Sequence, residues 1–203
     1  MIFGAKGRIM LLGKEKPKEE TVMNKNIRWI TQTAVMLALL VTLQALTKPA
    51  GQLVTGSFVN TVLAVAALVG GVSCGLVVAL CSPVVAYLLG IAPQILTVPA
   101  IMAGNAVFVV LLALLADKTG QNILRQVITW FAAAAAKFAA LYAIVVWLIC
   151  GLLSQQLLDS GLLKAPMLKA LPATFSWPQL VTALIGGAIA LAITPLLRKA
   201  LHK

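Results

Sequence analysis

Acidic residues and histidine are scarce in this chain. Only five of its 203 residues are Asp or Glu, and the one histidine is His202. Beyond Glu20 the acids are Asp117 and Asp159, which lie in different polar segments. Acid–base catalysis, serine–histidine nucleophiles and metal centres need such groups close together, and the sequence has no glycine-rich nucleotide-binding motif. We therefore expect no enzyme, no metal site and no cofactor.

Cysteine is sparse as well. Cys74, Cys81 and Cys150 fall within apolar runs and lack the CxxC spacing of metal and redox sites. We interpret them as small buried hydrophobic residues. The net charge of +11 does not indicate nucleic-acid binding, because the basic residues gather at the two termini and in one short loop. A nucleic-acid surface would instead carry a basic stripe on one face of the molecule.

Apolar residues dominate the rest of the chain. They make up 61% of the sequence, charged residues make up 10%, and the mean hydropathy is +1.02. Soluble domains have roughly 45–50% apolar and about 25% charged residues. One core could not hide this much apolar surface from water, so the lipid bilayer is the expected solvent.

Six long apolar runs predict an all-α membrane protein with six transmembrane helices. Lipid offers no partner for backbone N–H and C=O groups, so such runs cross it as helices. A β-barrel would need short segments of alternating polarity. Gly70 and Gly71 form a tight turn between the second and third runs, and the fifth run is long enough that it must tilt, bend or protrude. The runs cover about residues 29–46, 58–69, 72–89, 95–116, 123–153 and 177–197.

Basic residues predict the orientation of these helices. Of the sixteen Lys and Arg residues, twelve fall on the side that carries both termini, three fall on the other side, and Lys137 lies within a run. Positively charged segments stay in the cytoplasm, so we expect both termini to be cytoplasmic, in a bacterial inner membrane. Met23 opens the sequence MNKNIRW and is a second plausible start. We expect residues 1–26 to be a disordered cytoplasmic segment and residues 27–203 to form the transmembrane domain.

Lys137 is the residue most informative about function. It lies in WFAAAAAKFAALY, near the middle of the fifth run, with no acid close to it in sequence. A lysine at that depth costs several kcal/mol or more unless it has partners. One interpretation is a cation that faces a cavity and awaits an anionic or carbonyl-bearing ligand. The other is a lysine that is satisfied by backbone carbonyls or reaches for the membrane interface.

Five further residues are candidate ligand contacts. Asn105 and Asn60 are amides inside predicted helices, where the alternative role is a hydrogen bond between helices. Gln94 lies in an outward loop that a ligand could reach. Tyr142 and Trp177 fall on the outer halves of the fifth and sixth helices, where the alternative is an aromatic belt at the membrane interface.

Short motifs and the six-helix layout together form a recognisable combination. Ala34 and Ala38 make an AxxxA pattern in TAVMLALL, and four further segments are TGSFVN at 55–60, SP at 82–83, VPAIMAGN at 98–105 and AAKFAALY at 135–142. Over about residues 23–203, this combination resembles the substrate-binding S component of energy-coupling-factor (ECF) transporters.

The resemblance implies a protein that captures a vitamin or similar micronutrient outside the cell for uptake. The implied partners are a transmembrane scaffold subunit, which docks on the face of Ala34 and Ala38, and two ATPase subunits, which power transport. The implied ligand site lies near the outer side, among the fourth to sixth helices and beneath a lid formed by residues 48–57. Asn105, Lys137, Tyr142 and Trp177 fall in these regions.

Three other classes of function remain open. A stand-alone channel or carrier would need a coupling carboxylate or a polar path, and the predicted helices contain no Asp or Glu. A membrane assembly or anchor protein would use Lys137 for packing and bind no small ligand. An enzyme would lack both a nucleophile and a base. Co-purification with ECF ATPases would distinguish the capture protein from all three.

Overall fold

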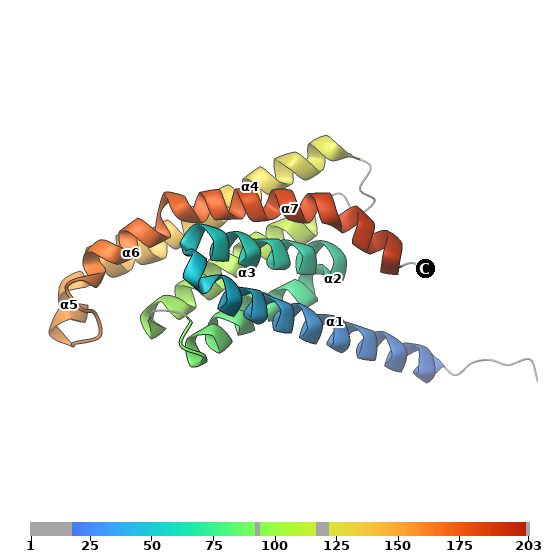
Figure 1. Ribbon diagram of the computed structural model, residues 1–203, viewed down its shortest axis with the longest axis horizontal. Coiled ribbons are helices and arrows are strands. Elements are labelled where there is room, and N and C mark those ends of the chain that lie inside the picture. Colours follow the sequence, from blue (N-terminus) through green and yellow to red (C-terminus); the bar gives the residue numbers. More distant parts are fainter. Residues whose placement is uncertain (1–17, 92–93, 117–121, 202–203) are drawn as a thin grey trace, which may run out of the picture.

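The computed structural model describes residues 18–91, 94–116 and 122–201, and this part of the chain is helical, without a β-strand (Figure 1). Five continuous helical segments are long and apolar enough to cross a membrane. The prediction of an all-α, multi-pass membrane protein is confirmed. Of the two longest segments, Gln52–Leu88 folds back on itself, and Met167–Ala200 comprises two consecutive helices.

Helix α2 (Gln52–Leu88) contains two of the predicted membrane passes. Its 37 residues would extend about 55 Å as one straight helix, nearly twice the thickness of the hydrocarbon core. The chain instead reverses at Gly71, whose φ of 81° and ψ of −175° are not helical. A Cβ on Gly75 would lie only 3.2 Å from the Cα of Ala67, so residues 52–70 and 72–88 pack as an antiparallel pair. The predicted turn at Gly70 and Gly71 is confirmed, and the chain makes six passes.

The other passes follow the predicted runs, except that α1 begins earlier. Helix α1 (Lys18–Thr47) precedes α2, and the short turn η2 (Ile95–Thr97) leads into α3 (Val98–Leu115). The fifth run continues from α4 (Ile123–Leu141) into a π-helix, η3 (Tyr142–Leu152). The bond from the backbone N–H of Leu153 to the carbonyl of Leu148 shows the wider i→i−5 turn. The long run therefore changes its helical pitch. The last pass is α7 (Trp177–Leu201).

The N-terminal boundary differs from the prediction. Helix α1 begins at Lys18, so residues 18–26 continue the membrane helix where we expected disorder, while residues 1–17 lie outside the described part. The physical reason is in the sequence, which has no Gly or Pro between Pro17 and Pro49 to end a helix. Lysine, glutamate and methionine are also good helix formers.

The segment of the expected lid, residues 48–57, is helical rather than a loop. Lys48–Ala50 form the 3-10 turn η1, and only Gly51, at φ 90°, separates that turn from α2. The hydroxyl of Thr55, on α2, donates to the carbonyl of Thr47, at the end of α1, at 2.8 Å and so connects these two helices. The outer segment 154–175 is also largely helical, in α5 (Ser154–Asp159) and α6 (Met167–Phe175).

The two ends of the bundle differ in charge. In Figure 1, the start of α1 and the end of α7 lie at the same end of the bundle, and η1, α5 and α6 lie at the other. The first of these ends carries Lys25, Arg28, Arg125 and Lys199, together with Arg198, which donates to the carbonyl of Leu68 at 2.8 Å. The opposite end carries Lys48, Lys164 and Lys169. This grouping agrees with the residue count that predicts cytoplasmic termini.

The distribution of polarity is the reverse of that in a water-soluble protein. Leu46, Leu88 and Leu196 are at least 70% exposed, whereas Asn60, Asn105 and Lys137 are at most 3% exposed. Exposed leucine is favourable in lipid, where buried polar groups need partners inside the protein. The same reasoning explains the cysteines: Cys74 is buried as expected, but Cys81 is exposed, so its interpretation as a buried residue was wrong.

Two hydrophobic clusters organise the interior. The larger lies around α2, which packs against α1, α3 and α7, and it includes the fully buried Leu63 and Phe108. The smaller lies at the end that carries α6, where Leu171 and Phe175 meet Leu141 and Val145. Three of the buried polar residues, Asn60, Asn105 and Lys137, contact one another and define the candidate site.

Candidate functional site

Lys137 projects from α4 into the interior of the bundle. It shares the buried side of the helix with Ala133, Ala134 and Leu141, which recur at the three- and four-residue spacing of one helix face. The small alanines allow α4 to pack closely on its neighbours, so the lysine side chain extends between helices. Its side chain is 3% exposed, which rules out the interpretation of a lysine that reaches the interface.

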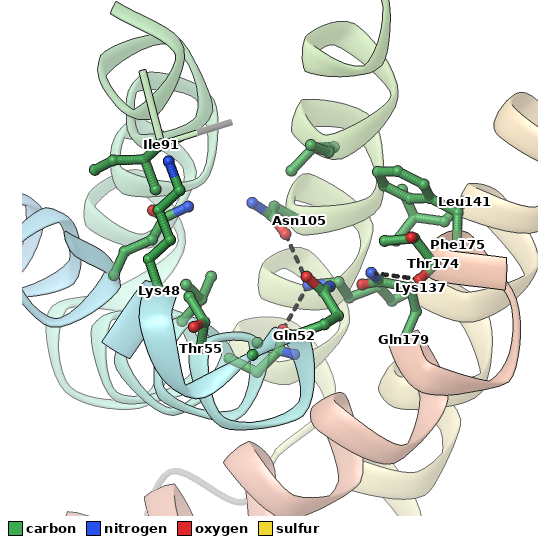
Figure 2. Close-up of a pocket in the computed structure, with 16 residues that line it drawn as sticks. Lys48, Gln52, Thr55, Ile91, Asn105, Lys137, Leu141, Thr174, Phe175 and Gln179 are labelled. Carbon is green, nitrogen blue, oxygen red and sulfur yellow. Dashed lines mark hydrogen bonds between the residues drawn. The ribbon is translucent and has the colours of Figure 1, made fainter. Parts of the chain in front are cut away.

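Two asparagine oxygens hold the ammonium group of Lys137. Its Nζ donates to Oδ1 of Asn60 at 2.5 Å and to Oδ1 of Asn105 at 2.7 Å (Figure 2). Asn60 lies on the first half of α2 and Asn105 on α3, so Lys137 connects three helices. The ring of Phe108, also on α3, lies 5.4 Å from Nζ, within the range of a cation–π contact.

The orientation of Asn60 is fixed by a further set of hydrogen bonds. Its Nδ2 donates to the hydroxyl of Thr182 at 3.2 Å, and that hydroxyl donates to the carbonyl of Gln179 at 3.1 Å. The amide oxygen of Asn60 is thereby directed at Lys137. The side chain of Gln179 donates in turn to the carbonyl of Thr174, at the end of α6. The network therefore extends from α4 through α2 and α7 to the junction with α6.

These partners leave the charge of Lys137 uncompensated. An ammonium group has three N–H donors, and the two asparagines accept from two of them. Both acceptors are neutral, and the residues that line the site include no Asp or Glu. A buried cation is stabilised most when it meets an anion, so a group with negative charge would complete the site.

A cavity of about 170 Å³ lies beside Lys137. Its interior is lined by Asn60, Asn105 and Lys137, and its walls include Leu141 and Phe175. The remaining lining residues come mainly from the end of the bundle that carries η1 and α6: Gln44, Lys48, Gly51, Gln52, Thr55, Gly56, Val59, Ile91, Ile101, Thr174 and Gln179. A cavity of about 150 Å³ holds a benzene molecule, so this one suits a small organic compound.

Lys48 lies at the rim of this cavity. Its Nζ donates to the carbonyl of Gly90, just beyond the C-terminal end of α2, at 2.6 Å. This bond joins η1 to the turn after α2, and Ile91 beside it also lines the cavity. Part of the segment 48–57 thus lines the cavity, as a 3-10 turn and the start of a helix.

The predicted site residues divide into two groups. Lys137, Asn105 and Asn60 come together around the cavity, in direct contact with one another. Tyr142 and Trp177 do not line it, and their side chains are 44% and 61% exposed. Their positions suit the alternative of an aromatic belt at the interface. We therefore leave both out of the candidate site.

Gln94 is also separate from the cavity lining. It precedes η2, where its backbone carbonyl accepts from the hydroxyl of Thr97 at 2.8 Å. Its side-chain Oε1 is buried and has no hydrogen-bond partner among the described residues. The neighbouring residues 92 and 93 lie outside the described part of the chain.

Sequence reasoning missed the contribution of α7. Gln179 and Thr182 lie on one helix face with Gly186, at spacings of three and four residues. A Cβ on Gly186 would lie 2.5 Å from the carbonyl oxygen of Ser57, so glycine is needed for α7 to approach α2 at this level. A polar stripe that ends in a glycine was the available signal for a close polar contact between helices.

The described residues contain no cluster of His, Cys, Asp and Glu that could hold a metal ion. Ala34 and Ala38, the predicted docking residues, lie exposed on α1. That helix packs mainly against α2 and borders the bundle (Figure 1). Comparison of the chain with protein-family models, with curated proteins and with solved structures finds no match.

Proposed function

We propose that this protein is a membrane-embedded capture subunit of an ECF-type importer, which binds a small anionic micronutrient from outside the cell. The observation that carries the proposal is the buried Lys137 beside a cavity, held by two neutral amides. Natural membrane proteins rarely place an ionisable residue at this depth without a use for it. Here the use is electrostatic attraction of the ligand.

The position of the cavity supports capture from outside. Its rim residues, Lys48 and Gln52, lie at the end of the bundle that carries few basic residues, which the positive-inside rule assigns to the outer side. Solutes from outside therefore reach the cavity through the region of η1 and α6. The chain carries no nucleotide-binding motif, so energy for release into the cell would come from partner ATPases.

The exposed side of α1 supports docking on a partner subunit. Small residues allow the backbones of two membrane helices to approach closely, and Ala34 and Ala38 are one turn apart. In this proposal a transmembrane scaffold subunit packs on them and connects the protein to two ATPase subunits in the bacterial inner membrane.

A structural role is the second candidate, and one observation favours it. Asn60 and Asn105 already satisfy two of the three N–H donors of Lys137, so the three residues could serve only to join α2, α3 and α4. A protein of this kind would be an assembly or anchor protein and would carry no small ligand.

Mass spectrometry of small molecules released from the purified protein distinguishes the two candidates. We expect the wild type, purified in detergent after growth in rich medium, to release one stoichiometric compound. The Lys137→Ala variant should release much less, and Lys169→Ala, which removes an exposed lysine at the same end of the bundle, should match the wild type. A wild type that releases no compound would favour the structural role.

Co-purification tests the partner subunits. A tagged wild-type chain should recover a scaffold subunit and two ATPases from its native membrane. Ala34→Trp should abolish recovery because a bulky side chain separates the two helices. Leu39→Trp is the matched control, since Leu39 is 44% exposed and lies about 100° around the helix from Ala38. Equal recovery with both variants would contradict docking on the Ala34 face.

A further inference from the structure

The amide of Asn105 provides a second donor beside Lys137. Its Oδ1 accepts from Lys137, so its Nδ2 is on the other side of the same amide group, and Figure 2 shows it pointing away from the lysine. No described residue accepts a hydrogen bond from this nitrogen, and Asn105 lines the cavity. The nitrogen is not among the fully buried side-chain atoms that lack a partner, so it has access to the cavity. A ligand in the cavity can therefore accept a hydrogen bond from it.

The charges around the cavity are all of one sign. Its lining includes two lysines, Lys137 inside and Lys48 at the rim, and no Asp or Glu. Lys48 is exposed and Lys137 is 3% exposed, so Lys137 is the one buried cation in the described lining. An ammonium group on the ligand would find no carboxylate there and would be repelled by Lys137.

The remaining walls are partly apolar. Leu141, Phe175 and Ile101 provide apolar surface, and Gln52 and Gln179 provide amides. A compound with a ring or short carbon chain suits these walls, and about 170 Å³ limits it to little more than one ring.

We infer that the ligand is a small monocarboxylate without an amino group, whose carboxylate accepts from Nζ of Lys137 and Nδ2 of Asn105. The two carboxylate oxygens match the two donors, one per donor, and the single buried ammonium group balances a single negative charge. A phosphate dianion would leave one charge unpaired, and an amino acid would carry a cation that the site repels. This inference rests on the proposed function and specifies its ligand class.

Three ring compounds of nearly equal shape test the charge requirement: benzoate, benzamide and benzylamine. Saturation-transfer NMR on the full chain in lipid nanodiscs should detect benzoate binding to the wild type. The affinity for benzamide should be lower than that for benzoate by about tenfold or more, and benzylamine should give no signal. Benzylamine binding as strong as that of benzoate would overturn the inference, and so would a lack of benzoate binding. Competition by inorganic phosphate as effective as that by benzoate would overturn the choice of a carboxylate.

The variant Asn105→Asp tests the donor pair without a change in side-chain shape. A carboxylate at this position removes the Nδ2 donor and pairs with Lys137, so affinity for benzoate should fall about tenfold or more. The ion pair between the new carboxylate and Lys137 should keep the Asn105→Asp variant folded. A second variant, Lys137→Met, removes the cation itself. The control is Asn122→Asp, which keeps an oxygen acceptor for the N–H of Arg125 at the start of α4. Unchanged benzoate binding in Asn105→Asp would refute the assignment of this amide.

Failure of the inference about the ligand can be distinguished from failure of the proposed function. If the purified protein releases a cation or an amino acid, the capture role stands and the inference about carboxylates is wrong. If the wild type binds benzoate but recovers no scaffold or ATPase subunits, the ligand class stands and the role in import is wrong.

Discussion

Substitution of Gly186 by alanine should loosen the contact between α7 and α2 on which the site depends. An added Cβ would lie 2.5 Å from the carbonyl oxygen of Ser57, 2.6 Å from Cβ of Asn60 and 2.7 Å from the backbone nitrogen of Thr61. Ordinary contacts begin near 3.4 Å, so the helices must separate by nearly 1 Å at this point. Two of the three neighbours are backbone atoms, which cannot move aside as a flexible side chain can.

The magnitude follows from overpacking against rigid neighbours, which destabilises a folded protein by about 1–3 kcal/mol. Alanine is also favoured over glycine in a helix by about 1 kcal/mol, and this gain partly offsets the loss. A control with the same chemical change removes that uncertainty. Gly151→Ala meets only the carbonyl of Val146, at an ordinary 3.6 Å, and should leave stability unchanged or slightly higher.

Gly104→Ala completes a graded series. Its added Cβ would meet Cγ of Leu141 at 2.7 Å, and this neighbour is a side chain that can rotate. We expect stability to decrease in the order Gly151→Ala, Gly104→Ala, Gly186→Ala. The largest difference, between the first and the last, should be about 1–3 kcal/mol.

Thermal unfolding in detergent, followed with a thiol-reactive dye, measures this series. Cys74 is completely buried and reacts only when the bundle opens, whereas the exposed Cys81 contributes to the signal before unfolding. A Gly186→Ala variant as stable as Gly151→Ala would refute the close approach of α7 to α2. It would also remove the basis for the orientation of Asn60 described above.

Three further predictions concern the site and its surroundings. Thr182→Val removes the hydroxyl acceptor that orients Asn60 and should weaken ligand binding about tenfold, whereas Thr182→Ser should keep the wild-type affinity. Equal affinities of the two variants in a binding titration would contradict the positioning role. Lys48→Met removes the hydrogen bond to the carbonyl of Gly90 and should increase the rate of ligand release. Because that bond is exposed, the stability should change by less than about 1 kcal/mol. An unchanged release rate, measured by stopped flow, would mean that the rim is not a barrier to release. A cysteine at Lys169 should react with an impermeant reagent in intact cells, and one at Lys199 should not; the opposite pattern would invert the orientation.

The contact between Lys137 and the two asparagines illustrates how far sequence reasoning could reach in the site. Each residue stood out because a polar group is expensive in lipid and therefore needs an explanation. That cost applies to every buried polar residue, so it selected candidates without saying which of them meet. Tyr142 and Trp177 were selected on similar grounds, yet aromatic residues are stable at a lipid interface and need no internal partner.

The sequence by itself determined that this protein is an all-α membrane protein, where its passes lie apart from the start of α1, and that the chain reverses at Gly71. Hydrocarbon demands long apolar helices, and only glycine tolerates the backbone conformation at the reversal, so both features follow from local composition. Only the tertiary structure decided which helix faces meet. It placed Asn60 and Asn105 around the ammonium group of Lys137. It also brought Thr182 and Gln179 of α7 to the site and made the residues of the expected lid helical. Side-chain contacts between helices depend on the rotation and close packing of each helix, which residues far apart in the chain control together.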